Sequence, residues 1–85
     1  MADYTIVLSK KAQKQLDKLS DPIAAPIVDT IIRLGKTPRP AGYKKLKGRE
    51  GYRVRVGNYR IIYDIYDTEL VVDVISLGHR KDIYL

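Results

Sequence analysis

The stretch from Tyr52 to Tyr63, which reads YRVRVGNYRIIY, decides the fold of this 85-residue chain. Two runs rich in β-branched and aromatic residues flank the pair Gly57-Asn58, and this arrangement is typical of a two-residue hairpin turn. Such a turn fixes the register, so Arg55 should face Arg60 across the two strands. Because side chains alternate between the faces of a strand, the stretch predicts one apolar face and one face that carries arginines.

A third strand should follow, after a turn at Asp67-Thr68. If Tyr66 faces Glu69 across that turn, Tyr63 faces Val72 and Arg60 faces Ile75. One face of the predicted sheet is then almost wholly apolar and should cover the helices, with Tyr52, Val54, Val56, Tyr59, Ile61, Tyr63, Ile65, Leu70, Val72 and Val74. The opposite face should carry Arg53, Arg55, Arg60, Ile62, Asp64, Val71, Asp73 and Ile75.

The first half of the chain predicts a short strand over residues 4–8 and then a tight pair of helices. Ser9 can cap the first helix, and Asp21-Pro22 is a good start for the second. Gly35 is a plausible end of the second helix, and residues 43–47 read as another short strand. We therefore expect a single α+β domain over residues 1–85, with two N-terminal helices packed on a twisted antiparallel sheet.

The composition limits the classes of site that the protein can hold. The chain has no cysteine and one histidine, so a standard metal site is improbable and we expect no cofactor. The N-terminus lacks the layout of a secretory signal, and no apolar run approaches the length of a membrane span. These features favour a cytoplasmic protein.

The positive charge is concentrated in one part of the chain. Residues 36–60 contain nine Lys or Arg and one acid, whereas the rest contains seven Lys or Arg and nine acids. A focused positive segment favours a polyanionic partner, either a nucleic acid or an acidic protein. A solvated basic loop is the alternative interpretation.

Three arginines on one face of a sheet are costly, since like charges directly opposed destabilise strand pairing. Asp64 and Asp73 on the same face could neutralise them. The alternative is an anion site, because the guanidinium group matches phosphate oxygens and stays charged. In the predicted register His79 and Arg80 emerge at the arginine end of the sheet, and an aromatic residue, Tyr84, follows within about one helical turn. Arginines that hold phosphate beside an aromatic ring that stacks a base are typical of an RNA site.

These motifs resemble the RelE family of bacterial and archaeal toxins. The resemblance is carried by Lys45-Leu46-Lys47-Gly48, by the stretch from Tyr52 to Tyr63, and by Val74-Ile75-Ser76-Leu77-Gly78-His79-Arg80. It implies cleavage of messenger RNA in the ribosomal decoding site without metal, by attack of a 2′-hydroxyl that leaves a 2′,3′-cyclic phosphate. It also implies a small RelB-like antitoxin that wraps the toxin, and a complex that binds its operator DNA through that antitoxin.

The resemblance also implies roles for particular residues. The implied catalytic set is Arg53, Arg55, Arg60, His79, Arg80 and Tyr84, and the expected RNA-binding residues are Lys44, Lys45, Lys47 and Arg49. Position 55 departs from the family pattern, in which a lysine is proposed as general base. An arginine does not readily lose its proton, so Arg55 is better suited to holding phosphate charge. His79 is then the side chain whose ordinary pKa suits proton transfer near neutrality.

Two other functions stay open at this point. A ParE-like toxin has the same fold but inhibits DNA gyrase by binding, and such proteins generally lack the arginine and histidine set. The second alternative is a catalytically inactive RelE-like protein that still binds antitoxin or RNA.

Overall fold

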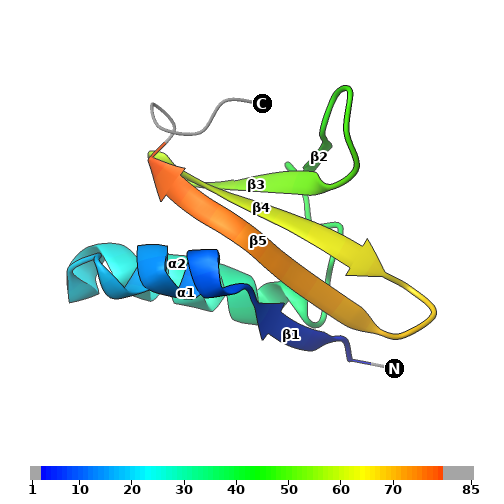
Figure 1. The fold of residues 1–85 in the computed structure, drawn as a ribbon, viewed down its shortest axis with the longest axis horizontal. Helices are drawn as coiled ribbons and strands as arrows, with labels where there is room; N and C mark the ends of the chain where they lie inside the picture. The colour runs from blue at the N-terminus through cyan, green and yellow to red at the C-terminus, as the bar shows by residue number, and fades with distance from the viewer. Residues whose placement is uncertain (1–2, 80–85) are drawn as a thin grey trace.

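The computed structural model describes residues 3–79, which form two helices and five strands (Figure 1). The elements follow the order β1, α1, α2, β2, β3, β4, β5 along the chain. Their bounds are β1 Thr5–Leu8, α1 Lys10–Asp17, α2 Asp21–Leu34, β2 Lys44–Lys45, β3 Tyr52–Val56, β4 Tyr59–Tyr66 and β5 Val71–His79. Both helices lie on one face of the sheet, so the predicted α+β architecture is confirmed.

The sheet is mixed, with the strand order β1-β5-β4-β3-β2. Strands β2 to β5 form the expected antiparallel meander, whereas β1 pairs parallel with the first half of β5, from Thr5 opposite Val71 to Leu8 opposite Val74. The two helices carry the chain back across the sheet between these segments, and a parallel pair needs such a crossover. The purely antiparallel sheet expected from the sequence therefore holds for four of the five strands.

The first hairpin has the predicted register, since Val56 faces Tyr59 and Arg55 faces Arg60. The second does not. Its turn spans four residues, 67–70, so that Tyr66 faces Val71 and Tyr63 faces Val74 rather than Val72. This shift of two residues keeps Val72 and Val74 on the helix face, because strands alternate with a period of two.

A β-bulge then shifts the register of β5 by one more residue. Tyr63 faces Val74 but Ile62 faces Ser76, so Ile75 is the extra residue. The predicted pairing of Arg60 with Ile75 is therefore wrong, and Arg60 faces Gly78 instead. An extra residue in one strand reverses the faces of everything beyond it, which brings Leu77 into the core.

The helix ends follow local capping chemistry. The Ser9 side chain accepts a hydrogen bond from the Ala12 amide at 3.0 Å, which confirms the predicted cap of α1. Ser20 rather than Asp21 is the capping position of α2, so Asp21 and Pro22 occupy its first turn. None of the helices in residues 3–79 is long and apolar enough to span a membrane.

The core lies between the helices and the predicted apolar face of the sheet. Val54, Ile61, Tyr63, Val72 and Val74 are buried there, which confirms that assignment, while the other predicted members are half-buried. The helices contribute a stripe of buried residues consisting of Ala12, Ile27, Ile31 and Leu34.

Candidate nucleic-acid site

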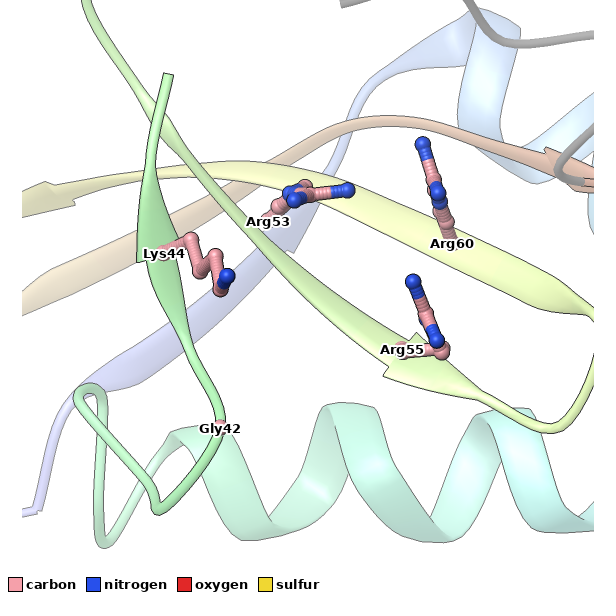
Figure 2. A pocket seen from close by; sticks show the side chains of 5 residues that line it. All are labelled: Gly42, Lys44, Arg53, Arg55 and Arg60. Atoms are coloured by element: carbon pink, nitrogen blue, oxygen red, sulfur yellow. The ribbon is translucent and has the colours of Figure 1, made fainter.

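Four cationic side chains surround a hollow of about 280 Å³ on the sheet face that the described helices leave uncovered. Lys44 comes from β2, Arg53 and Arg55 from β3, and Arg60 from β4, and Gly42 lies at the rim. Figure 2 shows these side chains gathered over the three strands. Three neighbouring strands therefore supply cations to one small space.

The register explains why these four side chains meet. Lys44 faces Arg53 across β2 and β3, and Arg55 faces Arg60 across β3 and β4. Arg53 and Arg55 are two residues apart on β3 and so point to the same side. The hollow is thus framed by two rows of directly opposed cations, in a region where like charges destabilise the pairing.

Carboxylates on the same face do not neutralise Arg53 and Arg55. Asp64 and Asp73 face each other across β4 and β5, and Asp64 lies two residues along β4 from Ile62, the residue opposite Arg53. Within residues 3–79, no carboxylate lies at ion-pair distance from Arg53 or Arg55, and the ion pair found there joins Arg39 to Asp67. The alternative, in which Asp64 and Asp73 pair with the arginines, is therefore not found for Arg53 and Arg55, and the hollow can attract an anion.

His79 lies at the arginine end of the sheet, as expected, but on the opposite face. It faces Tyr59 across β4 and β5, and the two rings meet edge to face with centroids 5.5 Å apart. Both residues line a hollow between the sheet and α2, together with Ile23 and Pro26. The sheet therefore separates the His79 ring from the side chains of Arg55 and Arg60, a consequence of the bulge that the sequence did not reveal.

Comparison with known proteins gives a consistent family. The model of the family described as ParE toxin of type II toxin-antitoxin system, parDE, matches residues 6–84. Toxin RelG of Mycobacterium tuberculosis is 32% identical over 95% of this chain and 95% of its own. The chain is a type II toxin of the RelE/ParE superfamily. The mRNA interferase toxin RelE of Escherichia coli is 27% identical to this toxin over 92% of this chain and 84% of its own.

Solved structures agree with this assignment. The toxin–antitoxin complex RelBE2 from Mycobacterium tuberculosis superimposes on this toxin with a TM-score of 0.81, 30% identity, and coverage of 93% of this chain and 100% of the other. The archaeal RelE–RelB complex from Pyrococcus horikoshii gives a TM-score of 0.82 at 25% identity, over 95% and 99% of the two chains. The sequence-based resemblance to RelE toxins is therefore confirmed.

The expected RNA-binding residues of the toxin separate into two groups. Lys44 belongs to the basic hollow, a placement that its position opposite Arg53 explains. Lys45 faces Tyr52 and so points to the other side of the sheet, while Lys47 and Arg49 lie exposed in the turn before β3. Only the first of the four contributes to the hollow itself. The predicted residues Arg80 and Tyr84 lie outside the described part of the chain.

Side-chain contacts of Arg39 and Tyr63, which we call the clasp, hold the loop that leads to β2. The Arg39 guanidinium donates two hydrogen bonds to the Asp67 carboxylate, at 3.2 and 2.9 Å, and lies 5.7 Å from the centre of the Tyr52 ring. The Tyr63 hydroxyl donates to the Pro38 carbonyl at 2.7 Å, and burial raises the pKa of Tyr63 to about 12, so it remains a donor. No local sequence motif reveals this clasp, because its partners lie 28 and 25 residues apart.

Proposed function

We propose that this toxin is an endoribonuclease that cleaves messenger RNA on the ribosome. The basic hollow carries the proposal, because Arg53, Arg55, Arg60 and Lys44 face the same space. Guanidinium groups match phosphate oxygens in geometry and charge. The names of two relatives, which are mRNA interferases, support the same activity.

In the proposed reaction the 2′-oxygen of one nucleotide attacks the adjacent phosphorus. The new bond joins the 2′-oxygen to phosphorus, and the bond from phosphorus to the 5′-oxygen breaks. The 2′-hydroxyl loses its proton and the leaving oxygen gains one, which yields a 2′,3′-cyclic phosphate and a 5′-hydroxyl. Negative charge builds on the phosphate oxygens during this step, and preorganised cations near those oxygens stabilise the transition state more than the ground state.

The cations have different places around the hollow. Arg55 and Arg60 face each other and can hold the two non-bridging oxygens of one phosphate. Lys44 and Arg53 form the next row and suit the neighbouring phosphate. None of these four is a good proton acceptor at neutral pH.

Proton transfer by His79 stays a prediction. The position of the ring does not favour direct proton transfer to or from the RNA. The ring packs against Tyr59 on the helix face, away from the phosphate position that Arg55 and Arg60 define. A base at this position has to act around the end of the sheet. The pH dependence of cleavage by His79→Ala decides the matter, since loss of a general base changes the acidic limb of the rate profile.

The partner that restrains the toxin is proposed to be a RelB-like antitoxin. Three similar solved structures are complexes of a RelE-type toxin with a RelB-type antitoxin, from Mycobacterium tuberculosis, Pyrococcus horikoshii and Escherichia coli. The basic hollow favours an acidic segment in the part of the antitoxin that approaches it, because carboxylates complement these guanidinium groups. Purification from the native host without any second small protein would contradict this proposal.

The test uses programmed ribosomes and maps the ends of the cleaved message. The toxin should cut the message in the decoding site and leave a 2′,3′-cyclic phosphate. Arg60→Ala should abolish most of the cleavage, whereas the matched control Arg33→Ala, on the exposed surface of α2, should cut normally. Intact message with wild-type toxin would refute the proposed activity.

Inhibition of DNA gyrase is the second candidate, and the description of the matching family as ParE favours it. A supercoiling assay with purified gyrase separates the two functions. Inhibition of gyrase together with intact ribosomal message would replace the first proposal. If the toxin neither cleaves the message nor inhibits gyrase, the remaining interpretation is a catalytically inactive RelE-like protein that binds antitoxin or RNA.

A further inference from the structure

Helix α1 takes the place of a neighbouring strand beside the second half of β5. Strand β1 pairs only with Val71–Val74, and residues beyond Val74 extend past its end. There the Gln15 side-chain oxygen accepts a hydrogen bond from the Leu77 amide at 2.8 Å, and the Ser9 hydroxyl donates to the Ile75 carbonyl at 2.6 Å. Backbone groups in a partly buried position need such partners. Two side chains of the helix region therefore satisfy the backbone groups that β1 does not reach.

One of the two hydrogen bonds is made by the bulged residue Ile75 and the other by Leu77, two residues later in β5. With regular pairing from Tyr63 and Val74 onward, Leu77 would stand opposite Arg60 and its side chain would enter the face of the basic hollow. The extra residue Ile75 puts Gly78 there instead. A glycine places no side chain beside Arg60. Bulges of this kind redirect side chains next to functional sites.

We propose that Gln15 is a positioning residue for the basic hollow. By holding the Leu77 amide, it fixes the bulged end of β5 and thereby the alignment of Gly78 with Arg60. Gln15 belongs to α1 and does not line the basic hollow; it lines a different hollow, together with Leu77 and Gly78. Its influence therefore passes through β5. The proposal rests on the proposed ribonuclease function.

The contact needs a hydrogen-bond acceptor of the right length at position 15. A glutamate side chain has that length and supplies a carboxylate oxygen, which accepts from an amide at least as well as glutamine. A methionine has a similar volume but offers only a weak acceptor. Gln15→Met should therefore release the Leu77 amide, and Gln15→Glu should retain it. Gln13→Met is the matched control, because Gln13 lies two residues away and its side chain donates a hydrogen bond to Asp17 at the surface.

Single-turnover cleavage at saturating toxin is the first readout. Gln15→Met should cleave about ten- to hundred-fold more slowly, because small misplacements of reacting groups cost up to about a hundred-fold in rate. Its affinity for the ribosome should change by less than about three-fold, since the cationic side chains remain. Gln15→Glu and Gln13→Met should cleave at about the wild-type rate.

Amide hydrogen exchange is the second readout and does not depend on cleavage. In Gln15→Met the Leu77 and Gly78 amides should exchange faster, while the Val72 amide in the core keeps its protection. The Arg60 side-chain resonance should also shift less when an uncleavable 2′-deoxy oligonucleotide is added. These measurements remain decisive if the wild-type toxin proves unable to cut RNA.

Two results would overturn the assignment. One is a wild-type cleavage rate and unchanged Leu77 exchange in Gln15→Met. The other is equal loss of rate, affinity and thermal stability in both Gln15→Met and Gln15→Glu, which marks a merely structural residue.

Discussion

Replacement of Arg55 by threonine should stabilise the fold while it removes function. Arg55 stands directly opposite Arg60 and lies on the same face as Arg53, and its own side chain is exposed. Directly opposed cross-strand pairs are worth about 0.2–1 kcal/mol, with an unfavourable sign for like charges. Threonine also has a high preference for strands. Together these effects should raise the free energy of unfolding by about 0.5–1 kcal/mol.

Thermal unfolding at two salt concentrations is the appropriate assay. For a domain of this size the gain corresponds to a rise in Tm of roughly 2–8 °C. Salt should reduce the difference between wild type and Arg55→Thr, because the screening length falls from about 8 Å at physiological salt to about 3 Å at 1 M. Lys45→Thr is the control, since it removes a cation from a strand position opposite Tyr52 rather than opposite another cation.

A lower unfolding temperature for Arg55→Thr than for wild type would refute repulsion between Arg55 and Arg60 as a source of instability. A gain in Tm that is as large at 1 M salt as at 0.15 M would refute it equally, because salt screens the repulsion between exposed charges.

Four further changes test other parts of the structure. Arg60→Ala should slow single-turnover cleavage about a hundred- to thousand-fold, or roughly 3–4 kcal/mol, and an unchanged rate would remove Arg60 from the reaction. Lys47→Ala should keep the cleavage rate but lower the slope of log affinity against log salt by about one, as expected for one lost phosphate contact. The Arg39 guanidinium holds the pKa of Asp67 below its usual range, so the stability that this pair adds is present above the unfolded pKa of about 4 and is lost as the pH falls through the folded value. The free energy of unfolding of Asp67→Asn, measured at neutral and at acid pH, should not show this loss. Gly51→Ala should lower the free energy of unfolding by about 1–3 kcal/mol in denaturant titrations, because the backbone φ at position 51 is +117°.

The first hairpin could be predicted residue by residue because its turn is local. Gly57-Asn58 joins the strands with two residues, Gly57 adopts a positive φ, and the register follows at once. The opposition of Arg55 and Arg60 was therefore readable from the sequence alone. Lys44 was named as an RNA contact, but its membership in the same hollow required the pairing of β2 with β3, which connects residues across an irregular turn.

The third strand shows where local reasoning stops. The four-residue turn and the bulge at Ile75 together shift β5 by three residues relative to the predicted register. An odd total shift reverses the face, which is why His79 lies beside Tyr59 rather than beside the arginines. The hydrogen bonds that accompany the bulge come from Ser9 and Gln15, more than sixty residues earlier in the chain. No sequence pattern within β5 indicates these hydrogen bonds.

Two features that lower stability converge on Arg60. It faces a like charge on β3, and the strand on its other side carries a bulge that replaces Leu77 by Gly78. The capped helix at Ser9 and the buried apolar face, in contrast, follow the rules of stable folding. Departures from those rules are expected where function requires them. Their coincidence at one residue, in a hollow framed by three further cations, makes Arg60 the first residue to test for the proposed cleavage.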